Sequence, residues 1–251
     1  MKIGNVFSSL LAKRGEALLH LSFLLKATMT YLALATDYDG TIATDGAVDA
    51  ATIAALTRWQ YADRKLILIT GRQLNNLQTV FTHWNQFDCI VAENGAVLHY
   101  PATGQEKCLG DRPSQRFIER LQAQGVEPLS IGQVIVATWD PHDQTARKII
   151  HEQKLPLQVI LNKGAVMILP IGVDKAAGLK AALIDLNVSL DQTVGVGDAE
   201  NDLAFLRLCG CSVAVANALP MLKETANWVT NGQRGAGVCE LIDRLLNLDS
   251  D

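Results

Sequence analysis

The feature that most constrains the fold is a set of short apolar runs, each followed within two residues by an acidic, glycine or other polar residue. These runs occupy residues 31–36, 65–70, 88–92, 193–196 and 212–215. Each is nearly continuous in apolar residues, which is typical of a strand buried on both faces. Segments with helical spacing separate them, and strands that alternate with helices predict a parallel sheet. We therefore expect an α/β fold with a three-layer, Rossmann-like parallel sheet as its core.

This rhythm changes between residues 101 and 172. Two helices and three strands are predicted here, at 113–124 and 143–153, and at 134–138, 157–161 and 166–169. The last two strands flank Asn162, Lys163 and Gly164, a turn sequence that predicts a hairpin. We therefore expect a core domain formed by residues 31–100 and 173–251, with a small inserted α+β cap domain at 101–172.

Residues 1–30 precede the first predicted strand. The apolar stretch 17–25 and a cleavage-like site ending at Ala35 resemble a signal peptide, but cleavage there would remove that strand. Lys26 interrupts the apolar stretch well short of the ~20 residues that a membrane helix needs, so we expect no stable membrane insertion. Two interpretations stay open: a helical N-terminal extension, and a true start at Met29.

Composition excludes several classes of protein. Hydrophobic residues make up 49% and charged residues 19%, as in a folded globular protein. The formal net charge of -4 offers no basic surface for nucleic acid, so we expect no nucleic-acid partner. The 5 cysteines are scattered and lack histidines at metal-ligand spacing, which favours reduced thiols in a cytoplasmic protein.

Chemically active side chains cluster where the predicted strands end. Asp37 and Asp39 follow the first strand, Thr70 closes the second, and Asp198 and Asp202 follow the strand 193–196. The carboxyl ends of parallel strands meet at one edge of the sheet, where ligands bind. Four carboxylates at one edge repel one another unless a hard divalent cation lies between them. Mg²⁺ suits such a site because it accepts a few protein oxygens and shares its shell with phosphate.

These motifs resemble those of the haloacid dehalogenase (HAD) superfamily. The DxDGT motif at 37–41, the TGR motif at 70–72, the isolated Lys175 and the GDxxND motif at 197–202 occur in that family's order. The insertion resembles the cap of the Cof-like, type IIB branch, and the resemblance covers residues 31–248. Sucrose-phosphatase-like and phosphoglycolate-phosphatase-like members have a similar arrangement.

The resemblance implies catalytic roles for these residues. Asp37 is expected to be the nucleophile that forms an aspartyl-phosphate, and Asp39 the general acid and base. Thr70 would hydrogen-bond the phosphoryl group, and Lys175 would neutralise its charge and that of Asp37. Mg²⁺ would be held by Asp37, the backbone carbonyl of Asp39 and Asp198, with Asp202 acting directly or through water.

Six further residues are expected to contact the substrate or support that contact. They are Gly71, Arg72, Asn94, Gly95, Asn201 and Asn217. Five of them have a structural alternative: Arg72 could form a surface ion pair, Asn94 and Gly95 a strand-end turn, and Asn201 and Asn217 a helix cap.

The function predicted from these observations is a magnesium-dependent phosphatase. Its substrate would be a small phosphorylated metabolite of the sugar phosphate or phosphoglycolate class. A phosphomutase of the same superfamily is the enzymatic alternative. A non-catalytic phosphoreceiver or regulatory module is less favoured, because receivers place the phosphorylated Asp on the third strand. The sequence leaves the oligomeric state open.

Overall fold

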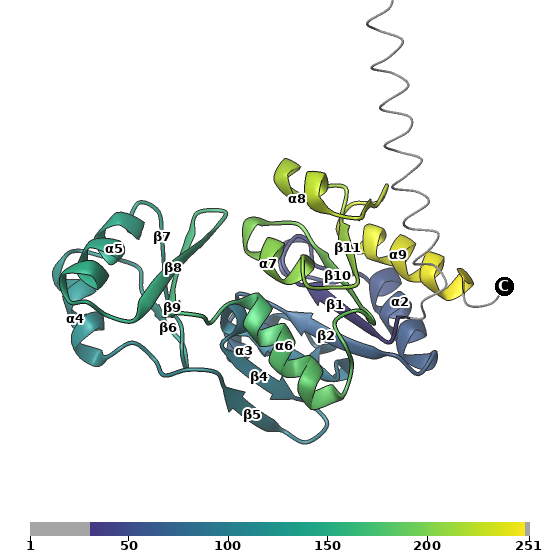
Figure 1. Ribbon diagram of the computed structural model, residues 1–251, viewed down its shortest axis with the longest axis horizontal. Coiled ribbons are helices and arrows are strands. Elements are labelled where there is room, and N and C mark those ends of the chain that lie inside the picture. The colour runs from purple at the N-terminus through teal and green to yellow at the C-terminus, as the bar shows by residue number, and fades with distance from the viewer. Residues whose placement is uncertain (1–30, 249–251) are drawn as a thin grey trace, which may run out of the picture.

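A computed structural model describes residues 31–248 of the 251-residue chain, so the expectations for residues 1–30 lie outside the described part. Figure 1 shows a large sheet with helices on both faces and a smaller α+β layer beside it. The strands are β1 (Ala33–Asp37), β2 (Lys65–Ile69), β3 (Cys89–Ala92), β4 (Val97–Tyr100), β5 (Gln105–Cys108), β6 (Ser130–Ile131), β7 (Val136–Trp139), β8 (Leu157–Asn162), β9 (Ala165–Pro170), β10 (Thr193–Gly197), β11 (Cys211–Ala214) and β12 (Trp228–Val229). The α-helices are α2 (Ala50–Tyr61), α3 (Leu74–Val80), α4 (Gln115–Ala123), α5 (Asp143–Glu152), α6 (Lys175–Leu186), α7 (Leu203–Leu206), α8 (Pro220–Thr225) and α9 (Arg234–Leu248). This architecture confirms the expected α/β fold.

The large sheet has the strand order β12-β11-β10-β1-β2-β3-β4-β5. All pairs from β12 to β3 are parallel, as the apolar runs predict. Strand β1 is central and fully buried, and it pairs with β10 on one side and β2 on the other. Thr36 pairs with Val196, so Asp37 and Asp198 emerge side by side at the carboxyl edge.

The far edge of this sheet differs from the prediction. Strands β4 and β5 are antiparallel additions beside β3. Strand β5 belongs to the large sheet although it falls within 101–172, and the division into core and cap stays a prediction. All residues of β5 are exposed, which explains why no apolar pattern predicts it.

Aspartate side chains cap the N-termini of two helices, and the second of these helices contributes a residue to the site. Asp49 caps α2 by accepting a hydrogen bond from the backbone N–H of Thr52 at 2.7 Å. Asp174 caps α6 in the same way, accepting from Ala177 at 2.8 Å. This cap makes Lys175 the first residue of α6 and directs the helix start toward the carboxyl edge of the sheet.

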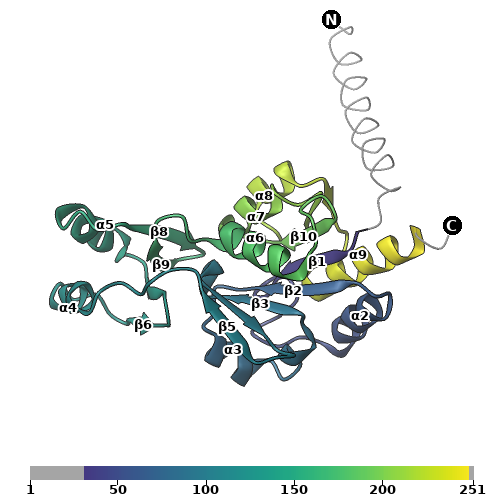
Figure 2. The same ribbon diagram turned by 60° about the horizontal axis from the view of Figure 1, so that its bottom comes forward.

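The inserted layer has a sheet of its own, in the order β6-β7-β9-β8. In Figures 1 and 2 this small sheet lies between the large sheet and the helices α4 and α5. These helices pack on it through a separate apolar cluster that includes Phe117 and Leu121. Val134 and Ile135, in contrast, belong to the apolar core of the large sheet. The inserted layer therefore has its own core and is also packed against the main one.

Glu93 joins the two layers. Its buried carboxylate accepts hydrogen bonds from the backbone N–H groups of Gln133, Val134 and Ile135, at 2.8, 2.8 and 2.9 Å. Glu93 also has a φ of 51°, a left-handed conformation that is uncommon outside glycine. Glu93 therefore combines a strained backbone with three charge-assisted hydrogen bonds to the inserted layer, and we infer that it stabilises the packing of the two layers.

Glu93→Ala is therefore expected to destabilise the protein by about 3 kcal/mol, since buried N–H groups are left without an acceptor. Urea denaturation measures this change. Glu119→Ala, an exposed glutamate of α4 that contacts Gln115, is the control and should change stability by less than about 0.5 kcal/mol. Equal stability of the two variants would show that the Glu93 contacts contribute nothing.

Candidate active site

The centre of the site is a buried ion-pair cluster at the carboxyl end of β1. Asp37, the last residue of β1, is 5% exposed, and Lys175 is 1% exposed. The Lys175 ammonium donates to Asp37 Oδ1 at 2.5 Å and to Asp202 Oδ1 at 2.7 Å. It fixes the orientation of the Asp37 carboxylate. Lys175 binds Oδ1 of this carboxylate, so Oδ2 is the oxygen that is available for attack.

The pKa values in this cluster reflect an excess of buried negative charge. Burial raises the pKa of Asp37, and the charge of Asp202 raises it further against the opposing effect of Lys175. Burial likewise raises the pKa of Asp198, although Lys163 opposes the shift. The pKa of Lys175 is raised: burial alone would lower it, but Asp202 and Asp37 outweigh that effect. The cluster therefore favours additional positive charge, from a proton or from a metal ion.

The loop after β10 is organised by Asp202. Its Oδ2 accepts hydrogen bonds from the backbone N–H groups of Asp198 and Ala199, at 2.9 and 3.0 Å. Gly197 makes this turn possible, because a Cβ atom there would lie 2.7 Å from Asp202 Oδ2. Asp202 thus holds Asp198 beside Asp37. Gly197, Asp198 and Asp202 of the GDxxND motif therefore each have a structural role in this loop.

The residues fit a hard divalent cation. Asp37, Asp198 and Asp202 each offer a carboxylate oxygen, and these three atoms lie within 4.8 Å of one another. An all-oxygen donor set of this kind suits Mg²⁺. Both oxygens of Asp202 already accept hydrogen bonds, from Lys175 and from the loop amides, which favours a contact through water for this residue.

Asp39 lies outside that cluster. Its side chain is 46% exposed and forms a two-point ion pair with Arg72, Nε to Oδ2 at 2.7 Å and Nη2 to Oδ1 at 2.8 Å. The Arg72 guanidinium also lies over the Tyr38 ring, 5.5 Å from its centroid. The ion-pair alternative for Arg72 is thus the one observed, and its partner is the expected general acid. A substrate contact for Arg72 stays a prediction.

The other expected residues form the floor of the site. The Thr70 hydroxyl is buried and accepts from the backbone N–H of Arg72 at 3.1 Å. Asn201 donates through Nδ2 to Asn94 Oδ1 at 2.9 Å, and both side chains are buried. Their direct contact with substrate stays a prediction.

Two glycines complete this floor. Gly95 packs against the backbone before Lys175, where a Cβ atom would clash with the carbonyl group of Asp174. Its φ of +106° also requires glycine. Gly71 faces Met167 of β9, so it lies where the inserted layer approaches the core. A direct substrate contact stays a prediction for both.

Asn217 supports the loop that follows β1. Its Nδ2 donates to the carbonyl oxygen of Gly40 at 2.8 Å, and its Oδ1 accepts from the backbone N–H of Arg234 at 2.7 Å. It makes no side-chain cap on α8. Asn217 therefore links the 37–41 loop to the start of α9, and its amide is engaged in holding that loop.

Sequence reasoning missed one residue at this site. Lys163, at the tip of the β8–β9 hairpin, contacts Asp198 Oδ2 at 2.5 Å. The hairpin itself was predicted, but its distance from the acidic cluster depends on how the inserted layer packs on the core. A lysine in an Asn-Lys-Gly turn was the one available signal.

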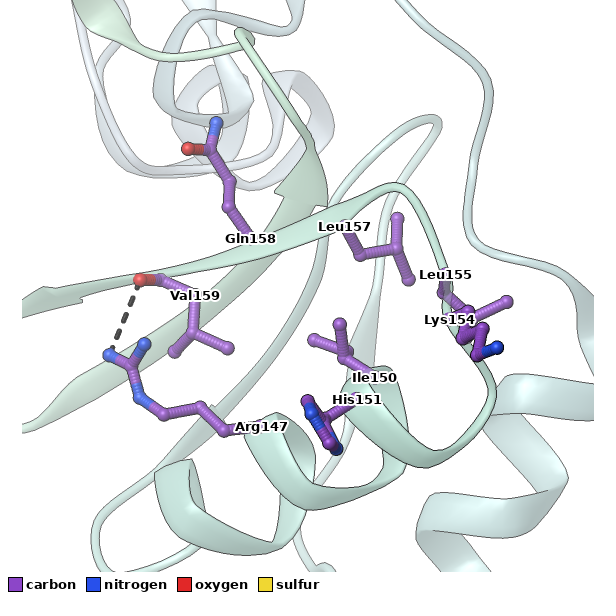
Figure 3. Close-up of a pocket in the computed structure, with 8 residues that line it drawn as sticks. All are labelled: Arg147, Ile150, His151, Lys154, Leu155, Leu157, Gln158 and Val159. Carbon is purple, nitrogen blue, oxygen red and sulfur yellow. Dashed lines mark hydrogen bonds between the residues drawn. The ribbon is translucent and has the colours of Figure 1, made fainter.

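A separate hollow of about 640 Å³ lies in the inserted layer between α5 and β8 (Figure 3). Ile150, Leu155 and Leu157 give it an apolar lining, and Arg147 donates across it to the carbonyl oxygen of Val159 at 3.4 Å. None of the predicted site residues lines it, and its lining includes no carboxylate. It is therefore separate from the acidic cluster.

The fold and site together define the class of protein: an α/β enzyme with an acidic cluster at the carboxyl edge of its sheet and an inserted layer beside it. The model of the haloacid dehalogenase-like hydrolases matches residues 34–119 and 111–242. The chain belongs to this family.

Named relatives and solved structures agree with this family assignment. The chain is 30% identical over 223 residues to phosphoglycolate phosphatase of Methanothermobacter thermautotrophicus, covering 85% of this chain and 98% of the relative. It is 29% identical over 226 residues to phosphoglycolate phosphatase 2 of Saccharolobus solfataricus, covering 86% and 93%. A haloacid dehalogenase-like hydrolase from Bacteroides thetaiotaomicron has the same fold, with a TM-score of 0.72 and 18% identity over 86% of this chain and 100% of the other. These matches confirm the prediction of a HAD-type phosphatase.

Within residues 31–248, no helix is long and apolar enough to cross a lipid bilayer. All 5 cysteines lie in this range, and no disulfide bond joins any of them.

Proposed function

We propose that the protein is a Mg²⁺-dependent phosphatase that hydrolyses a small phosphorylated metabolite through an aspartyl-phosphate on Asp37. The observation that carries this proposal is the buried Asp37–Lys175–Asp202 ion-pair cluster with Asp198 beside it. Such a cluster offers a fixed nucleophile, a buried cation for the phosphoryl charge, and oxygens for a metal. Phosphoryl transfer needs these components more than elaborate covalent chemistry.

In the first step, Asp37 Oδ2 attacks phosphorus while Lys175 and Thr70 bind the phosphoryl oxygens. Asp39 donates a proton to the leaving oxygen. In the second step Asp39 accepts a proton from water, which attacks phosphorus and releases phosphate. Arg72 pairs with both Asp39 oxygens in the described structure, so Asp39 has to release at least one of these contacts to take part in proton transfer.

Asp37, the backbone carbonyl of Asp39, and Asp198 would hold the metal ion, with Asp202 behind them. When bound, the ion neutralises charge on the phosphoryl group and on the acidic cluster.

We favour phosphoglycolate over a sugar phosphate as the substrate. The relatives in archaea carry that name, and the matches cover nearly their whole length. We also place the reaction in the cytoplasm, because 5 free cysteines suit a reducing compartment.

A panel of phosphate monoesters tests the substrate assignment. With Mg²⁺ present, phosphoglycolate should give the highest kcat/KM. The amount of inorganic phosphate released should equal the amount of substrate consumed. A sugar phosphate isomer in place of phosphate would identify a mutase. A higher kcat/KM for a sugar phosphate would overturn the phosphoglycolate assignment.

Metal binding should also be visible without substrate. Mg²⁺ at about 100 times its Kd is expected to raise the Tm by roughly 5–10 °C, because it binds the folded state alone. Asp198→Asn should abolish this shift, whereas Asp243→Asn, a surface change at the Arg58 ion pair, should preserve it. Differential scanning fluorimetry measures both. A full Mg²⁺ shift in Asp198→Asn would place the metal elsewhere.

A further inference from the structure

Lys163 occupies an unfavourable place for a lysine. Asn162 and Ala165 are the last paired residues of β8 and β9, so Lys163 and Gly164 form a two-residue hairpin loop. Both have positive φ, 46° and 86°, as in a type I′ turn. Asn, Asp or Gly is preferred at such positions, and a lysine there is strained. Strain of this kind is often retained at functional sites.

The side chain reaches from the inserted layer into the acidic cluster. Its ammonium lies 2.5 Å from Asp198 Oδ2, and Asp198 is 1% exposed. It also lies over the loop after β1, since a Cβ atom on Gly40 would be 3.1 Å from Lys163 Nζ. The Lys163 side chain itself is 46% exposed, so it retains a face toward solvent or ligand.

The charges of the site indicate what Lys163 binds. A divalent cation on Asp198 would repel the nearby ammonium, which then needs another anion. Lys175 already binds Asp37 and is the cation proposed to bind the phosphoryl group. Lys163 approaches the acidic cluster from the β8–β9 hairpin of the inserted layer, whereas Lys175 belongs to α6 of the core.

The distances limit the size of that substrate. The metal-ligand oxygens of Asp198 and Asp37 lie within 4.8 Å of each other, and Lys163 is 2.5 Å from Asp198. When a metal ion displaces the ammonium from Asp198, the hairpin still holds Lys163 next to this cluster, so an anion bound by Lys163 would be only a few atoms from phosphorus. A carboxylate on a one-carbon arm meets this limit, and it offers the ammonium a charge-assisted hydrogen bond.

We propose that Lys163 is a specificity-determining residue that binds the carboxylate of a short phosphorylated carboxylic acid. This assignment rests on the proposed phosphatase function and adds to it the residue that recognises the leaving group. A neutral sugar offers no charge to this ammonium, so Lys163 selects against it.

A matched pair of non-hydrolysable ligands tests the proposal by calorimetry. 3-Phosphonopropanoate carries the carboxylate, and propylphosphonate has a methyl group in its place. The wild-type protein with Mg²⁺ should bind the first roughly 30-fold more tightly, as expected for one hydrogen bond between charged groups. Lys163→Met should reduce this preference to less than about 3-fold, and Lys163→Arg should retain most of it.

Two further variants control for folding and for total charge. Lys163→Asn suits the left-handed turn, so its Tm should equal or exceed that of the wild type while the preference is lost. Lys148→Met removes the same charge from α5, where Lys148 is 71% exposed and pairs with Glu152, and should leave the preference intact.

The outcomes separate the two proposals. A carboxylate preference that is lost in Lys163→Asn and kept in Lys148→Met, together with hydrolysis of p-nitrophenyl phosphate by the wild type, supports both proposals. A preference that persists in Lys163→Met and Lys163→Asn overturns the role of Lys163. No hydrolysis of any phosphate ester by the wild type, with the Lys163-dependent preference present, overturns the phosphatase proposal alone.

Discussion

Asp37→Asn is expected to lower p-nitrophenyl phosphate hydrolysis by about 10⁴-fold or more, the size of effect that follows loss of a nucleophile. The amide cannot attack phosphorus, and Asp202, the other carboxylate that contacts Lys175, is held by the backbone N–H groups of Asp198 and Ala199. The fold should survive because Asn has the same shape and Lys175 keeps its contact with Asp202 at 2.7 Å. Circular dichroism and steady-state release of p-nitrophenol measure the two effects.

The control for this variant is Asp243→Asn, which makes the same chemical change on the surface of α9. It should retain full activity. Substantial hydrolysis by Asp37→Asn would mean that another residue is the nucleophile, and Asp39 would be examined first.

Lys175→Met is expected to lower both stability and activity. It leaves Asp37 and Asp202 buried without their shared cation, and removal of one partner from a buried ion pair costs about 3–5 kcal/mol. Activity should fall by about 10³-fold with the loss of phosphoryl charge stabilisation. Urea denaturation and phosphate release measure these losses.

The stability loss should depend on pH in a defined direction. The pKa of Asp37 is already raised above its ordinary value, and removal of Lys175 raises it further. A carboxyl group with a raised folded-state pKa contributes stability below its unfolded-state pKa, and that contribution is lost as the pH rises through the folded-state value. The deficit of Lys175→Met should therefore be smaller at about pH 5 than at about pH 8.

Lys180→Met is the matched control, because Lys180 lies on the exposed side of the same helix. It should be near wild type in stability and activity at both pH values. A Lys175→Met protein as stable as this control would contradict the assigned role of the buried ion pairs.

Much of the site could be predicted because it depends on local pattern and on one topological rule. Apolar runs identified β1, β2 and β10, and the parallel arrangement places their carboxyl ends together. Asp37 and Asp198 could therefore be placed side by side from sequence. The structure adds that Lys175 contacts both Asp37 and Asp202, and that Asp202 orders the loop through its amide contacts.

The remainder depends on packing between segments far apart in the chain. Strand β5 has only exposed residues, so its pairing with β4 left no hydrophobic pattern. Glu93 binds amides some forty residues further on. Lys163 approaches Asp198 only because the inserted layer is packed over the carboxyl edge. The spacing of residues along the chain predicts neither the Glu93 contacts nor the Lys163 contact.

The central claim is that Asp37 takes the phosphoryl group during turnover. Acid quenching of the protein with Mg²⁺ and p-nitrophenyl phosphate, followed by borohydride reduction, converts an acyl phosphate on aspartate into homoserine. Peptide mass spectrometry should find homoserine at position 37 in the wild type and none in Asp37→Asn. Unmodified Asp37 during active turnover, or homoserine at a different aspartate, would contradict this account.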